Sequence, residues 1–494
     1  MPAVPAHLQS RIVSGMRWTL WLSVFAAPFS YGTAVLLARV GPQVIGTFGL
    51  LAVYTGVVTC LFYLGGDAVS IKFIPQLSHD RRASFLASYF VILLLGLIPW
   101  LTLAGLWPQA LRYLFGEQDL SFRFLLLCLS PLCLANALVA AALKAQLEMR
   151  WAQLMARTVT IGSFLIYAVL FVGLRQLLAS HYSILVWAVY LGLVALALCV
   201  GFLHLMRLSR WEFGWHSLRF FLPEGFWKYT LTTEAVSALS FLLQKLDMIL
   251  VLNFGGLAVL GKYVAVTGLA ALISVGSNFF LDTLLPSLTN LLASRNYCAA
   301  SQIYSISLRT VFLVTMFGTS ALIFLVKPII IFLGPQYTSL NPVFVLAILL
   351  YGLSAPGALG GTLLSSVGKQ HRSAIVGVVQ LLLFLLLFCA LWPKHQLAGA
   401  VLSTGISLVV SNLLLIQVAR YRNDVKFSFA RDYSALALAL ASAALLHLRL
   451  NELGLIYSLL AWPVVVLLFC ILAGYSVKEY RRLFACFLPA RFFP

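Results

Sequence analysis

The sequence predicts an all-α, polytopic membrane protein with about fourteen transmembrane helices and with both chain ends in the cytoplasm. Its composition, the length of its apolar segments and the placement of its basic residues predict this fold class. Of the 494 residues, 62% are hydrophobic and only 10% are charged, which is more apolar surface than a water-soluble core can bury. The apolar segments are about 20 residues long, as membrane helices require, whereas the strands of a membrane barrel alternate over about 10 residues.

Short polar breaks separate these apolar segments and give the bounds of the expected helices. The connections are too short to hold a soluble catalytic domain on either side of the membrane. The expected spans are 14–37, 45–71, 84–107, 121–143, 158–178, 182–206, 229–253, 262–288, 306–333, 342–366, 373–392, 397–419, 433–449 and 455–477.

The loops indicate the orientation. With the N-terminus inside, roughly 23 Lys and Arg residues fall in cytoplasmic loops and roughly 8 in external ones, as the positive-inside rule requires. Lys144, Arg150 and Arg157 are counted among the cytoplasmic loop residues. The net charge of +19 does not predict nucleic-acid binding, because the basic residues lie between apolar spans rather than on one soluble domain.

An internal repeat relates helices 1–6 to helices 7–12. It matches Gly41 with Gly256, Gly46 with Gly261, Phe48 with Tyr263 and Pro75 with Pro286. Because each copy holds an even number of helices, both copies have the same orientation, and their axis of symmetry should follow the membrane normal. We therefore expect a six-helix lobe at 1–206, an interfacial linker at 207–228, a second six-helix lobe at 229–420, and two extra helices with a cytoplasmic tail at 421–494.

The residue types that carry enzyme chemistry are dispersed. The eight cysteines form no CxxC pair, and no histidine lies near a cysteine at ligand spacing. The sequence therefore predicts no metal site, no cofactor and no catalytic nucleophile. It indicates a transporter or channel rather than an enzyme.

Several short motifs resemble the polysaccharide-transporter branch of the multidrug, oligosaccharidyl-lipid and polysaccharide exporter superfamily, which includes the O-antigen-type lipid-linked oligosaccharide flippases. The motifs follow a basic lead into helix 1. They are R-x-G-P-x-x-x-G-x-F-G-L from Arg39 to Leu50, Leu64-Gly65-Gly66-Asp67, Lys245-Leu246-Asp247, and Gly256 followed by Gly261-Lys262-Tyr263.

The resemblance implies two lobes around a central cavity lined mainly by helices 1, 2, 7 and 8. It implies alternating access for a polyprenyl-diphosphate-linked oligosaccharide in the bacterial inner (plasma) membrane, for cell-surface polysaccharide such as the O-antigen of lipopolysaccharide. Membrane lipids, a polysaccharide polymerase and export machinery are the partners that it implies. A cation-coupled multidrug exporter of the same superfamily is the nearest alternative. A membrane glycosyltransferase or polymerase is disfavoured, because the external loops hold no paired acidic residues.

Helices 7 and 8 each carry a polar stripe, which should face water or protein because a charge that faces lipid is costly. For an anionic diphosphate cargo, Lys and Arg are the expected contacts, although cations near helix ends can instead snorkel to headgroups. Pro28 falls in the middle of helix 1, where a kink is expected and a bend there can gate the cavity. The cavity candidates are Arg17, Arg39, Glu234, Lys245, Lys262, Asn278 and Arg309.

Three further acidic residues, Asp67, Asp247 and Asp282, are candidates for coupling or ion pairing. Asp67 lies beside Gly65 and Gly66, where a carboxylate can titrate. Asp247 is about 140° from the Glu234 stripe, which favours a partner on a neighbouring helix. Two interpretations remain open for the charged residues Glu234, Lys245, Asp247 and Asp282: an interhelical ion-pair network that fixes packing, or a hydrated cavity or a relay for protons or cations.

Overall fold

The structure, a computed structural model, describes residues 28–106, 120–146, 148–209, 220–293, 296–367, 369–421, 429–450 and 455–474, and four earlier positions, Trp18, Leu22, Phe25 and Ala26. In these residues all regular structure is helical, and nine helices are long and apolar enough to cross a membrane. The count of fourteen spans and the inside position of both ends stay predictions. The chain divides into two compact units, Met1–Ala265 and Val266–Pro494.

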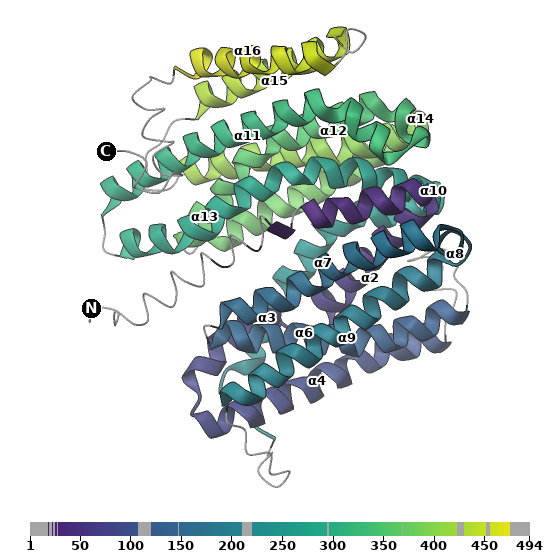
Figure 1. The fold of residues 1–494 in the computed structure, drawn as a ribbon. Coiled ribbons are helices and arrows are strands. Elements are labelled where there is room, and N and C mark those ends of the chain that lie inside the picture. The colour runs from purple at the N-terminus through teal and green to yellow at the C-terminus, as the bar shows by residue number, and fades with distance from the viewer. Residues whose placement is uncertain are drawn as a thin grey trace, which may run out of the picture. The chain divides into compact units, whose positions relative to one another are not determined.

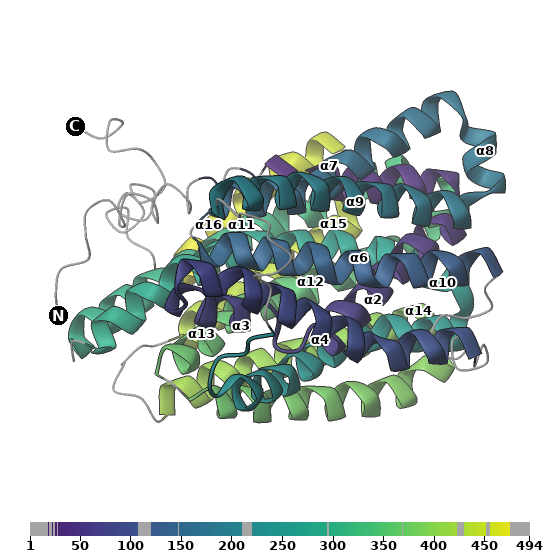
Figure 2. The ribbon, with the colours of Figure 1, turned by 90° about the horizontal axis from the view of Figure 1, so that it is seen from below.

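The first unit is built around α6. Tyr54 stabilises this packing from α2 by donating a hydrogen bond to the carbonyl of Leu126 at 2.8 Å, and Tyr167 likewise donates to Val186 at 3.0 Å. Figure 2 shows α6 beside α9 and α9 beside α7. Residues 28–40 are helical and lead into the labelled elements. These are α2 (Pro42–Leu61), α3 (Gly66–Phe73), η1 (Ile74–Gln76), α4 (His79–Leu106), α6 (Leu120–Ala145), α7 (Met149–Gly173), α8 (Arg175–Ser180) and α9 (Tyr182–Ser209).

The second unit packs around α11, which contacts α12, α15 and α16. The last two helices form a hairpin beside α11, yellow-green to yellow in Figure 1. Trp462 of α16 holds this hairpin by donating a hydrogen bond from Nε1 to Ser320 of α11 at 2.9 Å. The elements are α11 (Tyr297–Leu333), η3 (Pro335–Leu340), α12 (Asn341–Ser354), η4 (Ala355–Gly357), α13 (Ala358–Ser366), α14 (Gln370–Tyr421), α15 (Ala430–Leu450) and α16 (Leu455–Ala473).

The element α10 (Phe226–Ala293) consists of two helices joined across a kink, and it covers both predicted helices 229–253 and 262–288. The chain turns at Gly256, whose φ of 76° favours glycine, and the following residues continue as helix. In the same way α14 contains the predicted spans 373–392 and 397–419, with the break at Gln396. The boundary between the two compact units falls inside α10, whereas the predicted lobe boundary is the linker 207–228, of which residues 210–219 lie outside the described part. The lobe bounds remain a prediction.

Glycines at the repeat positions let α2 and α10 cross at very short range. A Cβ atom on Gly46 would overlap the carbonyl oxygen of Leu257, and one on Gly261 would overlap the carbonyl oxygen of Pro42. The two contacts are reciprocal, because the same shift along the chain carries Gly46 to Gly261 and Pro42 to Leu257. Two copies related by a two-fold axis make contacts of this form. The crossing thus has the local symmetry that a parallel repeat predicts.

Alanine at Gly261 is expected to force α2 and α10 apart and to destabilise the fold by about 1–3 kcal/mol. The matched control is Gly268→Ala in the same helix, where a Cβ would meet no atom within 4 Å. That control should leave the stability unchanged or raise it by up to about 1 kcal/mol. The midpoint of thermal unfolding of the purified protein measures both effects, and equal midpoints for the two variants would contradict the crossing.

Candidate functional site

The predicted helix 45–71 is wrong as a single element, because the chain breaks before the motif Leu64-Gly65-Gly66-Asp67 is complete. Helix α2 ends at Leu61, and α3 begins at Gly66. Between them Leu64, Gly65 and Gly66 have φ values of 43°, 84° and 57°. Glycine adopts this left-handed backbone without steric cost, whereas most other residues would be strained in it. The two adjacent glycines therefore permit the break. Asp67 therefore lies in the first turn of a short second helix, where the helix dipole favours a carboxylate.

Side chains from two other helices satisfy the backbone at this break. Tyr89 of α4 donates its hydroxyl to the carbonyl oxygens of Tyr63 and Leu64, each at 2.8 Å. Glu234 of α10 accepts a hydrogen bond from the backbone N–H of Gly65 at 2.7 Å. In a membrane, non-helical backbone is tolerated only where protein or enclosed water satisfies its polar groups. The break is thus a built feature that joins α2, α4 and α10.

An aromatic cluster holds Tyr89 in place. Its ring centroid lies 5.8 Å from that of Phe85 and 5.6 Å from that of Phe226, and Phe226 is 1% exposed. Rings at these separations attract one another and resist rotation. The start of α10 is therefore packed against the residue that satisfies the broken backbone.

Asp67 forms an ion pair with Lys144, the last basic residue of α6. Sequence reasoning missed Lys144 as a site residue, because the expected helix ended at 143 and Lys144 was counted as a loop residue. The spacing offers a weak signal, since a lysine one residue beyond an expected helix falls within the uncertainty of a boundary. It also missed Tyr89, because no sequence pattern marks a tyrosine that binds a distant helix break.

Three more of the predicted site residues, Lys245, Asp247 and Lys262, lie on α10. Lys245 is half-buried, and its Cγ atom lies 3.6 Å from the position that a Cβ on Gly56 of α2 would occupy. Asp247 accepts hydrogen bonds from the Tyr263 hydroxyl at 2.5 Å and from the Met248 N–H at 2.7 Å. The Tyr263 bond spans the break at Gly256. Lys262, which is also half-buried, directly precedes Tyr263.

The remaining predicted site residues do not join this group in the described part of the chain. Arg39 is exposed at the end of helical residues 28–40, and its carbonyl accepts a hydrogen bond from Arg175 at 3.3 Å. Pro28 is exposed and helical. Arg17 lies outside the described residues, as do the side chains of Asn278 and Asp282, whose backbone belongs to α10. Their proposed roles stay predictions.

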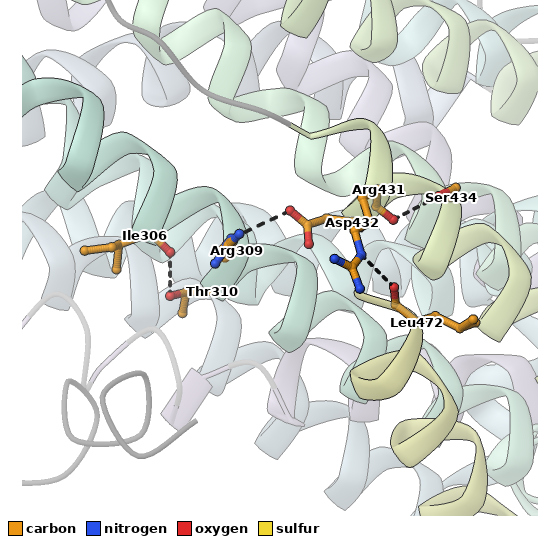
Figure 3. A network of polar contacts seen from close by, with 7 residues as sticks. All are labelled: Ile306, Arg309, Thr310, Arg431, Asp432, Ser434 and Leu472. Atoms are coloured by element: carbon orange, nitrogen blue, oxygen red, sulfur yellow. Dashed lines mark hydrogen bonds and ion pairs between the residues drawn. The ribbon is translucent and has the colours of Figure 1, made fainter. Parts of the chain in front are cut away.

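Arg309 lies in the second unit, on α11. Its Nε atom is 3.9 Å from Oδ2 of Asp432 on α15. Figure 3 shows the two side chains pointing toward each other. The neighbouring Arg431 donates from Nε to the carbonyl of Leu472 on α16 at 3.1 Å. Asp432 is 4% exposed, so the Arg309 guanidinium compensates a buried carboxylate. This contact joins the extra C-terminal hairpin to the repeat.

We expect Asp67 and Lys144 to be coupled in stability. Asp67→Asn and Lys144→Met should each lower the midpoint of thermal unfolding, and the double variant should lose less than the two single losses together. The Asp67 side chain is 41% exposed, so the coupling should be at most about 1 kcal/mol. Lys72→Met is the control, because the Lys72 Nζ atom contacts an aromatic ring, 3.7 Å from the centroid of Tyr229, rather than Asp67. Its effect on the midpoint should therefore add to that of Asp67→Asn. Strict additivity in the Asp67–Lys144 cycle would show that the pair contributes nothing.

In the described residues, no group of three His, Cys, Asp or Glu side chains lies close enough to hold a metal ion. The arrangement is instead a set of charges and freed backbone groups on membrane helices. Such groups on broken membrane helices are typical of transporter binding sites.

The sequence profile described as "Polysaccharide biosynthesis protein" matches residues 12–292, more than half of the chain. The search of curated protein sequences found no match to this chain. Among solved structures, the lipid II flippase MurJ in an inward closed conformation is similar, with a TM-score of 0.69 at 17% identity over 94% of this chain and 99% of MurJ.

Two further similar structures are transporters of the MOP superfamily. An inward-facing multidrug resistance MATE transporter has a TM-score of 0.65 at 12% identity, over 85% of this chain and 98% of its own. A transporter from Pyrococcus furiosus has a TM-score of 0.57 at 15% identity, over 86% and 96%. At these identities the likeness concerns the fold. The family match shows that the chain belongs to the polysaccharide biosynthesis protein family, and the solved structures show that it has the multi-pass membrane fold found in MOP-superfamily transporters.

Proposed function

We propose that this protein is a transporter, a flippase that moves a polyprenyl-diphosphate-linked oligosaccharide across the bacterial plasma membrane for cell-surface polysaccharide synthesis. The observation that carries the proposal is the match of residues 12–292 to the polysaccharide biosynthesis family. The fold shared with MurJ, a lipid II flippase, supports a lipid-linked glycan as the class of cargo.

The charges of the first unit fit an anionic cargo. Lys245 and Lys262 lie half-buried on α10, within a helix apolar enough to cross a membrane. Lysine binds phosphate as a point charge, and its position inside a span requires that it face protein or water. Arg39, together with Arg17, which lies outside the described residues, would extend this set of cations. Alternating access would expose the cations to each side of the membrane in turn.

A cation-coupled multidrug exporter is the second candidate. The similarity to MATE transporters favours it, and so does the half-buried carboxylate of Glu234, which forms no ion pair within 4 Å in the part of the chain that the structure describes. A carboxylate of this kind suits a cationic substrate or a coupling ion. The surplus of cations on the first unit favours the lipid-linked glycan.

Complementation tests the proposal. A bacterial host that lacks its polysaccharide flippase is expected to regain surface polymer, and to lose its accumulated lipid-linked precursor, when it expresses this chain. Lys245→Ala and Arg39→Ala should each lower the rescue at least about tenfold, because each removes a charged phosphate contact. Lys394→Ala, at an exposed position of α14, is the control and should rescue fully. Absence of rescue for several glycans, combined with increased drug tolerance, would favour the multidrug exporter.

Glu234→Gln separates the charge of Glu234 from its hydrogen bond, because the Gln carbonyl can still accept from Gly65. If Glu234 or Asp67 couples transport to protons or sodium, Glu234→Gln and Asp67→Asn should keep the fold and lose most of the transport driven by an ion gradient. Uptake into vesicles with and without an imposed gradient measures this. Full transport by both variants would show that neither carboxylate couples.

A further inference from the structure

Helix α7 carries two arginines that the sequence places in a cytoplasmic loop. The structure instead has both Arg150 and Arg157 within α7 (Met149–Gly173), a helix long and apolar enough to cross a membrane. Arg157 is half-buried, two turns beyond Arg150, and α7 contains no acidic residue. An arginine at such a place must face protein or water, and it marks a functional site more often than a surface cation does.

The contacts of α7 show which way this arginine pair faces. Positions 150, 157 and 164 follow one another at two-turn intervals and so share one face of the helix. The Arg150 guanidinium lies 5.5 Å from the ring of Trp18, and the ring of Phe164 lies 5.3 Å from that of Phe29. Trp18 and Phe29 both belong to the predicted first helix. The face that holds the arginines is therefore directed at helix 1.

A different face of α7 packs against α9. The ring of Trp151 stacks on that of His204 at 4.1 Å, and a Cβ on Gly201 would overlap the sulfur of Met155. Position 157 is about 160° from position 155 around the helix, so Arg157 points away from this contact. Packing against α9 thus does not require an arginine at 157.

We infer that Arg150 and Arg157 form a phosphate-binding pair that takes the diphosphate of the carrier lipid on the helix 1 side of α7. This inference rests on the proposed function and adds two cargo contacts to it. The Cα atoms of the pair lie about 10 Å apart along the helix axis, a separation that two long arginine side chains can close around one diphosphate. Guanidinium binds phosphate through two parallel hydrogen bonds.

The experiment measures the affinity of the purified full-length chain for undecaprenyl diphosphate in nanodiscs of phosphatidylcholine. Arg157→Gln and Arg150→Gln should each weaken binding at least about tenfold. Arg157→Lys should lose part of the affinity, since it keeps the charge without the planar fork. Arg207→Gln is the matched control, because Arg207 is an exposed arginine in the last turn of the neighbouring α9. The affinity of this variant for undecaprenyl diphosphate should be within twofold of that of the native chain.

The outcomes separate this inference from the proposed function. If the native chain binds undecaprenyl diphosphate and folded Arg157→Gln binds it equally well, the inference alone is overturned. If Arg157→Gln does not fold, equal binding by Arg157→Lys and Arg150→Gln would overturn it. Absence of native binding would overturn the diphosphate-carrier part of the proposed function as well. Undecaprenol, which has no phosphate, should bind without regard to Arg157. If phosphatidylglycerol shows the same dependence on Arg157, the pair is a general headgroup site and its assignment to the carrier lipid is wrong.

Discussion

The need to satisfy every backbone polar group inside a bilayer governs this structure. A helix meets that need within its own segment, which is why regular structure throughout the described residues is helical. The break at Leu64–Gly66 is an exception in the first unit, and Tyr89 and Glu234 supply hydrogen-bond partners for its backbone. A break in a predicted membrane helix thus requires specific residues from elsewhere in the chain. Those residues are functional candidates for this reason, and not because they are polar.

The same need explains which parts of the fold the sequence predicts. Long apolar segments predicted membrane helices, and most expected spans coincide with helices in the described part. The repeat pairs Gly46 with Gly261, and the structure brings both to one close crossing of α2 and α10. A glycine pair of this kind can be interpreted from the sequence, because glycine permits close approach of two backbones. The break between α2 and α3 was not predicted, since the same two glycines fit the interior of a small-residue helix equally well.

Charged residues were harder to place. Glu234 and Lys245 were identified from the spacing of polar positions on one helix, which needs no tertiary information. Lys144 and Arg157 were missed, because each stands within a few residues of an expected helix end and the positive-inside rule already accounts for cations there. Whether such a cation is a loop charge that sets the orientation or a residue with a specific partner depends on where the helix begins and on what its faces contact. Only the structure supplies the Asp67 partner of Lys144 and the face of α7 that carries Arg157.

The position of Glu234 has a mechanical consequence. Helix α10 carries Glu234 in the first compact unit and continues past Ala265 into the second. Its hydrogen bond to Gly65 ties the start of α10 to a backbone that has no helical partner of its own. A shift of α10 at Glu234 would leave the Gly65 N–H unsatisfied, which in an apolar setting costs several kcal/mol unless water or another acceptor replaces the carboxylate. The glycine break at Gly256 lies further along α10, and the hydrogen bond from Tyr263 to Asp247 joins the segments on its two sides, so the anchor at Glu234 and the close crossing at Gly261 belong to one packed part of the first unit.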